Sequence, residues 1–353
     1  MSKFTHRFSY KNPKPQKTAC VVRYGAFGDL MQASSVWAGL KKQGYHVTVF
    51  TSPPGSDVIT HDPNIDNLVL FDKDQVPNGN LGDFWKWHSK KYDKWVNLSE
   101  SVEGTLLAMQ GRMPALYPPQ VRHALMNRNY VEFQHAIADI PYELNIKFYR
   151  TTEEARWAKS TRAKMGAGPV IVWSLAGSSV HKTWAGLDSI LASIMLEFPT
   201  ARVVLTGGPE CAMLEAGWEN EPRVICKSGV WSIRETLSFC QEADLVIGPE
   251  TGVLNSVACE HVAKAVFLSH STHENLTRDW VNTTPLWSRN THCAGRGANA
   301  APACHLLHYG WSNCTRDEET GTAQCQKDIS VQDVWHAIYP VLCAVVDSRR
   351  EAA

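Results

Sequence analysis

The residues with the clearest potential for chemistry are Glu250, Thr251 and Gly252. They follow a predicted buried strand at 244–247 and a Gly-Pro break, and the pattern turns helical after Thr251. A helix start leaves backbone N–H groups unpaired and therefore favours an anion. We expect Thr251 and Gly252 to let the backbone approach such an anion, with Glu250 accepting hydrogen bonds from sugar or ribose hydroxyls. The alternative is an ordinary strand–helix junction with Thr251 as its N-cap.

A second candidate turn, Gly25-x-x-Gly28-Asp29, follows a predicted strand at 18–23 and precedes a helix to about residue 42. It is not the dinucleotide fingerprint, because one glycine is missing and no acidic residue closes the next strand. Asp29 is expected at the carboxyl end of the first strand, the edge where open α/β sheets bind ligands. The alternative is that Asp29 only caps the helix.

Two further loops follow predicted strands of the second half. One carries Lys182 and Trp184, and the other carries Gly207 and Gly208. Parallel strands share one carboxyl edge, so these loops should meet Glu250 there. A lysine, several backbone N–H groups and a carboxylate suit a diphosphate with a sugar and a nucleoside on either side. The alternatives are a solvated surface lysine and a plain glycine turn.

These motifs together resemble glycosyltransferase family 9, the heptosyltransferase-like group, over residues from about 18 to 346. The resemblance is carried by four elements, each weak singly but fairly specific in this order and spacing. They are Gly28-Asp29 at a helix start, Gly177-Ser178 followed by Lys182-Thr183-Trp184, Gly207-Gly208-Pro209-Glu210 after a strand, and Glu250-Thr251-Gly252. The resemblance implies the α/β GT-B fold, in which two Rossmann-like doubly wound domains face a central cleft.

The resemblance also implies roles. Asp29 would be the general base, with Gly28 on the acceptor side. The donor would be bound by Lys182, Gly177, Ser178, Gly207, Gly208, Glu250, Thr251, Gly252 and Asn255. The implied activity is an inverting, metal-independent and cofactor-free transfer of sugar from a nucleotide-diphosphate sugar of the ADP-heptose type. The acceptor would be a hydroxyl of a glycan, lipopolysaccharide or another molecule. Heptosyltransferases usually carry Asp in place of Glu250 and often His in place of Asn255, which leaves the donor open.

The predicted domain organisation follows the two series of strands and helices. Residues 1–17 form a polar tail, 18–165 an acceptor-side domain, and 169–330 a donor-binding domain after the Gly/Pro break at 166–169. A loop with cysteines occupies 293–325. The segment 331–353 forms a last helix, which could cross back to the first domain.

The composition is that of an ordinary soluble globular protein. The 353 residues are 44% hydrophobic and 20% charged, with 35 basic and 35 acidic side chains. This balance disfavours nucleic acid as the main partner. No apolar run approaches the roughly 18 residues of a membrane span. The start of the chain lacks a signal-peptide core, so we expect a cytoplasmic protein with at most peripheral membrane contact.

Four cysteines, Cys293, Cys304, Cys314 and Cys325, lie in the loop at 293–325. Their spacing lacks the short Cys-x₂₋₄-Cys pairs of common zinc sites. Three interpretations stay open: reduced packing cysteines, a structural zinc site, or disulfides.

Two other functions stay open as well. The first is a non-catalytic protein that binds nucleotide sugars on the same fold. The second is a glycosyltransferase acting on modified nucleic-acid bases through a basic patch at Arg112, Arg122 and Arg128. The sequence does not predict an oligomeric state.

Overall fold

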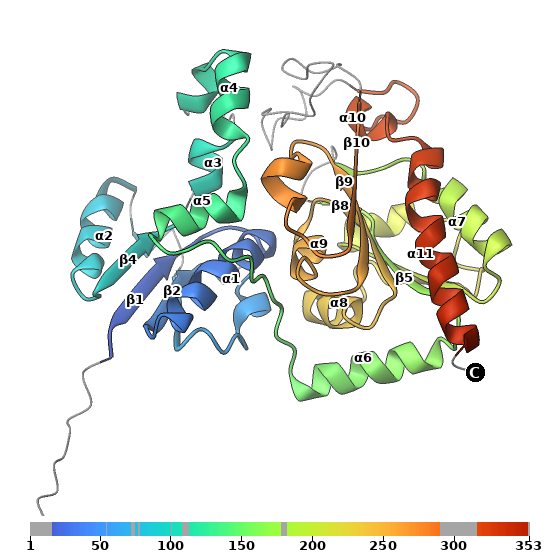
Figure 1. The fold of residues 1–353 in the computed structure, drawn as a ribbon, viewed down its shortest axis with the longest axis horizontal. Helices are drawn as coiled ribbons and strands as arrows, with labels where there is room; N and C mark the ends of the chain where they lie inside the picture. The colour runs from blue at the N-terminus through green and yellow to red at the C-terminus, as the bar shows by residue number, and fades with distance from the viewer. Residues whose placement is uncertain are drawn as a thin grey trace, which may run out of the picture.

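The computed structural model describes residues 16–53, 55–71, 75–76, 78–99, 101–107, 113–177, 182–289 and 316–351. These residues fold into two α/β lobes, which the extended segment 141–151 connects (Figure 1). Ser178, Cys293, Cys304, Cys314 and most of the predicted tail at 1–17 lie outside the described residues.

The first lobe is built on a parallel sheet with the strand order β3-β2-β1-β4. β1 is buried along almost its whole length, as expected for a strand covered on both faces. The strands are β1 Thr18–Val22, β2 His46–Thr51, β3 Asn67–Leu70 and β4 Lys94–Asn97. The helices are α1 Phe27–Lys42, α2 Leu81–Ser89, α3 Ser101–Thr105, α4 Pro119–Met126 and α5 Tyr130–Ile137, with 3₁₀ turns η1 Ser56–Ile59, η3 Asn78–Asn80 and η4 Met113–Leu116.

The second lobe contains a larger parallel sheet with the order β10-β9-β8-β5-β6-β7. Its strands are β5 Val170–Ser174, β6 Arg202–Thr206, β7 Val224–Cys226, β8 Leu245–Pro249, β9 Ala263–Leu268 and β10 Thr283–Trp287. Its helices are α6 Thr152–Lys164, α7 Leu187–Glu197, α8 Ile233–Cys240, α9 Gly252–Ser256, α10 Gln324–Lys327 and α11 Val331–Glu351, with the turns η6 Pro209–Leu214 and η7 His273–Thr277.

Strand order places a ligand-binding edge in each sheet. In both sheets the order of strands reverses beside the first strand of the lobe, between β1 and β4 and between β5 and β8. Ligands of open α/β sheets bind at the carboxyl ends of the strands at such a reversal. The predicted catalytic turn follows β1, and the predicted donor loops follow β5 and β8, so the fold delivers both to the expected edges.

The two strands predicted at 18–23 and 244–247 match β1 and β8 to within two residues, whereas several elements, β10 and α2 among them, were not predicted. β10 contains Pro285 and lies at the edge of its sheet, which is where a strand tolerates proline. α2 carries Leu81, Phe84 and Trp85 at helical spacing, although none of its residues is fully buried. α3 ends at Thr105, and residues 108–112 are outside the described part.

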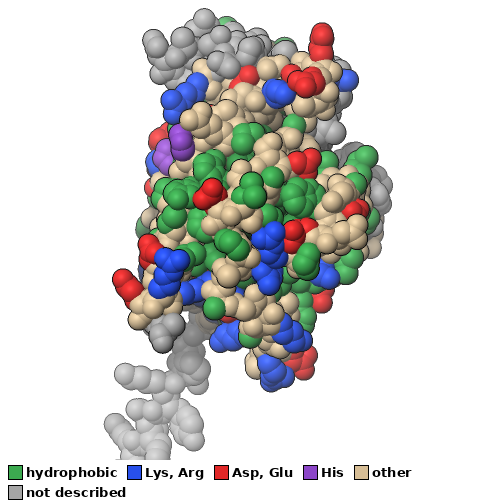
Figure 2. All heavy atoms as spheres, turned by 90° about the vertical axis from the view of Figure 1, so that its right-hand side faces the viewer, with side chains coloured by type: hydrophobic (Ala, Val, Ile, Leu, Met, Phe, Trp, Pro, Cys, Tyr) green, Lys and Arg blue, Asp and Glu red, His purple; other side chains and the backbone are tan. Residues whose placement is uncertain are grey.

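Two helices pack differently from the sequence interpretation. α6 was placed with the first domain, ahead of the boundary at 166–169, but its helix contacts are with α8 of the second lobe. α11 does not cross to the first lobe; it packs on α7, β9 and β10 (Figure 1). Figure 2 shows this outer side of the molecule, where apolar side chains lie among charged ones. A helix pattern defines a buried face but not the sheet that covers it.

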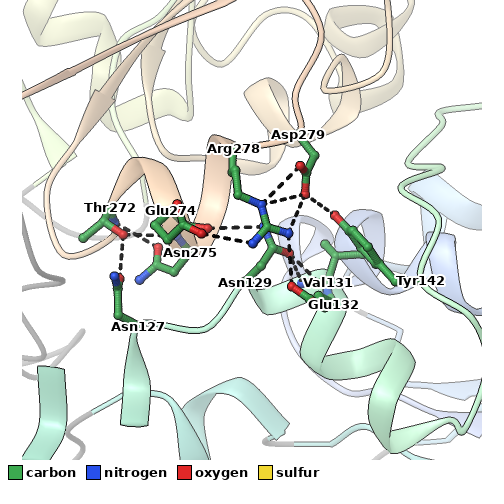
Figure 3. Close-up of polar contacts among 10 residues, drawn as sticks. All are labelled: Asn127, Asn129, Val131, Glu132, Tyr142, Thr272, Glu274, Asn275, Arg278 and Asp279. Carbon is green, nitrogen blue, oxygen red and sulfur yellow. Dashed lines mark hydrogen bonds and ion pairs between the residues drawn. The ribbon is translucent and has the colours of Figure 1, made fainter. Parts of the chain in front are cut away.

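The two lobes share one hydrophobic cluster. It runs from Leu30 and Val36 of α1 to Val253 and Leu254 of α9. Polar contacts lie beside it, and Figure 3 shows one group: Arg278 binds Glu132 at 3.0 Å, and Tyr142 donates to Asp279 at 2.5 Å. In the same group Thr272 donates to Asn127 at 2.7 Å. Elsewhere, Arg234 of α8 donates to the Asp57 carbonyl of the first lobe at 2.6 Å and to Glu154 of α6.

Trp184 is buried in the core two residues after Lys182. Its indole stacks on Trp173 of β5 and Phe267 of β9, with ring centroids 6.0 and 5.1 Å away. Its Nε1 donates to the Ile329 carbonyl at 2.9 Å, so the polar atom of this buried ring is satisfied. The tryptophan of the Lys-x-Trp motif is thus a core residue that anchors its neighbour.

We expect Trp184→Ala to lower the free energy of unfolding by about 3–5 kcal/mol, because it removes a large buried ring and leaves a cavity. Trp184→Phe keeps the stacking and loses one hydrogen bond, so it should lose only about 1–2 kcal/mol. Denaturant unfolding of the three proteins measures both. Equal losses in the two variants would contradict the stacking role.

Candidate active site

A pocket of about 570 Å³ lies between the lobes at the carboxyl ends of the strands. Apart from Ser178, which is not described, every catalytic, acceptor-side or donor-binding residue predicted from the sequence lines it. They are Gly28, Asp29, Gly177, Lys182, Gly207, Gly208, Glu250, Thr251, Gly252 and Asn255. The loops of two sheets therefore meet in one cavity, although their residues are up to 227 positions apart in the chain.

Asp29 has two structural partners and also faces the pocket. It is the third residue of α1, and its Oδ2 accepts a hydrogen bond from the Ala26 N–H at 2.9 Å, so it does cap the helix. Its Oδ1 accepts one from Arg23 Nη2 at 2.8 Å. About 32% of the side chain stays exposed, on a residue that lines the pocket. Burial raises the pKa of this carboxyl, whereas the Arg23 charge opposes that rise.

Lys182 is buried rather than a solvated surface lysine. Only 7% of the residue is exposed, and its Nζ donates to the Glu250 carbonyl at 3.0 Å. Burial lowers the pKa of the amine, and the carboxylates of Glu250 and Asp29 counteract this. The amine thus lies in the field of acids from both lobes.

The Glu250 carboxylate holds the turn that follows β9. Oε1 accepts from the backbone N–H groups of Ser269 and His270 at 3.1 and 3.0 Å, and Oε2 accepts from Ser271 N at 3.2 Å. The Ser269 hydroxyl and His270 Nδ1 also contact Oε1. Burial alone would raise the pKa of Glu250, but His270, Lys182 and Ser269 hold it well below its ordinary value. The predicted donor contact of this side chain stays a prediction.

Two buried polar atoms in the pocket wall have no partner among the described residues. Thr251 is at the N-cap position of α9, yet its side chain makes no capping hydrogen bond and Oγ1 is unpaired. Asn255 Oδ1 is also unpaired, while its Nδ2 donates to the Gly28 carbonyl at 3.4 Å. Buried polar atoms are normally satisfied, so these two favour a ligand. α9 itself has only 5 residues, which leaves little macrodipole.

Gly28 and Gly252 bring the lobes into backbone contact. A Cβ on Gly252 would lie 2.1 Å from the Phe27 ring and 2.9 Å from the Gly28 Cα. A Cβ on Gly28 would lie 3.2 Å from the Gly252 Cα. Glycine is required here for the approach of the two lobes, which the sequence interpretation had ascribed only to a ligand.

The pocket lining also contains residues that sequence reasoning did not select. Phe27, Trp231 and Thr236 line the pocket, and Arg23 lies behind it with 1% exposure. Of these four residues only Arg23 has a signal in the sequence, because it is a charged residue that directly follows an apolar strand. The others come from loop and helix positions without a motif. Among the described lining residues the ionisable groups are Lys182 and three acids, Asp29, Glu210 and Glu250.

The cysteine interpretations are largely untested by the structure. Cys325 is buried in α10, and its three companions lie outside the described residues. Within the described part of the chain no group of three or more His, Cys, Asp or Glu residues could hold a metal ion. Nor does any helix of that part have the length and apolar character to cross a membrane. Of the predicted basic patch, only the Arg128 side chain is described, stacked over Phe133.

Comparison with known proteins gives no sequence match: no family model and no curated protein matches the chain. Solved structures do match. A glycosyl transferase of family 9 from Veillonella parvula has a TM-score of 0.65 and 13% identity, covering 94% of this chain and 99% of its own. The ADP-heptose lipopolysaccharide heptosyltransferase II of E. coli has a TM-score of 0.62 and 13% identity, with 93% and 99% coverage. The iron-containing dodecameric glycosyltransferase TibC of enterotoxigenic E. coli H10407 has a TM-score of 0.56 and 12% identity, with 94% and 78% coverage.

The likeness extends over nearly the whole chain and concerns the fold. It confirms the predicted GT-B architecture with two Rossmann-like lobes.

We expect Gly252→Ala to destabilise the protein by about 1–3 kcal/mol, because the added methyl group overlaps Phe27 and the opposite lobe. Gly82→Ala is the matched control: its Cβ would meet nothing within 4 Å, in an exposed helix. That control should stabilise by about 0.5–1 kcal/mol. Denaturant unfolding measures both, and a Gly252→Ala protein as stable as the wild type would show that the lobes do not touch here.

Proposed function

We propose that this protein is an inverting, metal-independent glycosyltransferase that moves a sugar from a nucleotide-diphosphate sugar to a hydroxyl acceptor. One observation carries the proposal: Asp29 of the first lobe and Lys182 of the second line the same pocket. An inverting transfer needs a base on one face of the sugar and a stabilised leaving group on the other. The fold shared with the E. coli heptosyltransferase II supports a donor of the ADP-heptose type.

In the proposed reaction Asp29 takes the proton of the acceptor hydroxyl. The acceptor oxygen then forms a bond to the anomeric carbon of the sugar. The bond from that carbon to the diphosphate oxygen breaks, and the electron pair leaves with the nucleoside diphosphate. The Arg23 and Ala26 hydrogen bonds fix both carboxylate oxygens of Asp29, so the base is oriented before the substrate binds.

Lys182 would stabilise the negative charge that develops on the leaving diphosphate. It lies in a buried position, where a charge interacts more strongly than in water. The unpaired Thr251 Oγ1 and Asn255 Oδ1 are suited to phosphate oxygens or sugar hydroxyls, respectively. We further propose that Glu250 serves the donor site by holding the 269–271 turn in place.

Asp29→Asn should reduce transfer by a factor of about 100–10,000 and leave donor affinity nearly unchanged, because the amide cannot accept the proton. Turnover with a panel of nucleotide-diphosphate sugars, together with calorimetric titration of the nucleotide diphosphate, measures both quantities. Normal turnover in this variant would refute the base assignment. Tight donor binding without turnover in the wild type would favour a nucleotide-sugar-binding protein.

Lys182→Ala should raise the dissociation constant for the nucleoside diphosphate by about 10–100-fold, because it removes a charge-assisted contact of about 1.5–3 kcal/mol. Lys327→Ala is the control, since that lysine lies on the surface of the same lobe with 38% of its side chain exposed. Equal affinities in the two variants would exclude the phosphate role. Loss of wild-type turnover on adding EDTA would overturn the metal-independent scheme.

A further inference from the structure

Arg23 lies behind the pocket as a buried cation that bridges two carboxylates. Its Nη2 donates to Asp29 Oδ1 and to Glu103 Oε1, both at 2.8 Å. Its Nη1 donates to Glu103 Oε2 at 3.1 Å and to the Leu98 carbonyl at 3.2 Å. The guanidinium is 1% exposed, whereas the Asp29 and Glu103 side chains are 32% and 20% exposed. Both acids thus lie between a buried charge and solvent.

The topology of the first sheet brings these residues together. β1 and β4 are neighbouring parallel strands, with Val22 opposite Asn97. Arg23 directly follows β1, and Glu103 lies in α3, shortly after β4. The two residues are 80 positions apart in the chain. They therefore meet at the same reversal of strand order that places Asp29 at the pocket.

A purely structural role for Arg23 would require only one carboxylate partner, and Arg23 has two. A buried guanidinium is expensive unless it is paired, and one carboxylate neutralises it. Here two carboxylates share it, so the group carries a net charge of about −1 when all three members are ionised. Glu103 takes the bidentate side of the guanidinium, and Asp29 receives a single bond from Nη2. The stronger bidentate contact is thus made with Glu103, the acid that does not line the pocket.

We propose that Arg23 and Glu103 are positioning residues for the transfer reaction: Arg23 orients the Asp29 carboxylate, and Glu103 holds the guanidinium so that it donates only one bond to Asp29. This inference rests on the proposed function of Asp29 as the base. It assigns to Glu103, which no motif selected, an effect on that base through a shared cation.

The charges that face Asp29 come from three elements. Arg23 follows β1, Glu103 comes from α3, and Lys182 comes from the loop after β5; the Ala26 N–H adds a hydrogen bond. Burial raises the pKa of Asp29, Arg23 and Lys182 lower it, and Glu103 raises it. Loss of the Glu103 charge should therefore lower the pKa of Asp29, and loss of the Arg23 charge should raise it.

The test is a direct titration of the Asp29 carboxyl by ¹³C NMR in the full-length protein with labelled aspartate, assigned by the signal that is missing in Asp29→Asn. Glu103→Gln should move the midpoint down by about one pH unit, and Arg23→Met should move it up by at least as much. Glu143→Gln is the charge-matched control, because Glu143 is a carboxylate of 63% exposure that pairs with Lys42 on the surface; it should move nothing. If Arg23→Met does not fold, the Glu103→Gln arm decides alone.

The acid limb of the kcat/KM profile should follow the NMR midpoint in Glu103→Gln, with nucleotide affinity unchanged. Arg23→Lys should restore most of the activity that Arg23→Met loses. A midpoint that does not move, or moves in the same direction in both variants, would overturn the positioning role whatever the activity. A midpoint that moves while the acid limb stays fixed would overturn the assignment of Asp29 as the base, and with it the part of the two residues in the reaction.

Discussion

The pocket depends on a backbone contact between the lobes. Gly28 is the second residue of α1 in one lobe, Gly252 is the first residue of the short helix α9 in the other, and their backbones lie close together. An added methyl group at Gly252 would overlap the Phe27 ring, and one at Gly28 would press on the Gly252 backbone, so this contact leaves little room for a side chain at either position. The Asn255 amide, which donates to the Gly28 carbonyl, lies at the same point. The glycines of the two motifs are therefore explained by the contact between the lobes as much as by any ligand.

The charges of the site are arranged around one buried cation from each lobe. Arg23 is matched by two carboxylates, and Lys182 donates to a peptide oxygen in the field of Glu250 and Asp29. Burial disfavours the charged form of Lys182, and a bound diphosphate would reverse that effect because a nearby anion favours an ammonium group. Binding of an anionic ligand and protonation of the amine are thus linked. Because nearby acids already balance the charge of Lys182, its protonation can respond when an anionic ligand binds.

Much of the site could be predicted from sequence because it follows local rules. Glu250 directly follows β8, and Asp29 and Lys182 belong to the turns and loops that follow β1 and β5; parallel strands bring such positions to one edge. The partners of these residues could not be predicted in the same way. Glu103 meets Arg23 across 80 positions, and Glu250 meets the 269–271 turn across about 20, and neither spacing is a motif. β10 was missed for a related reason, because Pro285 is compatible with a strand only at an edge that the sequence does not reveal.

The hydrophobic cluster that joins α1 to α9 has a consequence for how the molecule unfolds. Domains joined only by a linker and a polar interface melt independently, whereas a shared apolar interior couples them. Here Leu30 and Leu254, from different lobes, belong to the same cluster, with hydrogen bonds and ion pairs beside it. The lobes should therefore melt in a single cooperative transition. A destabilising change in the interior of either lobe should lower the melting temperature of both.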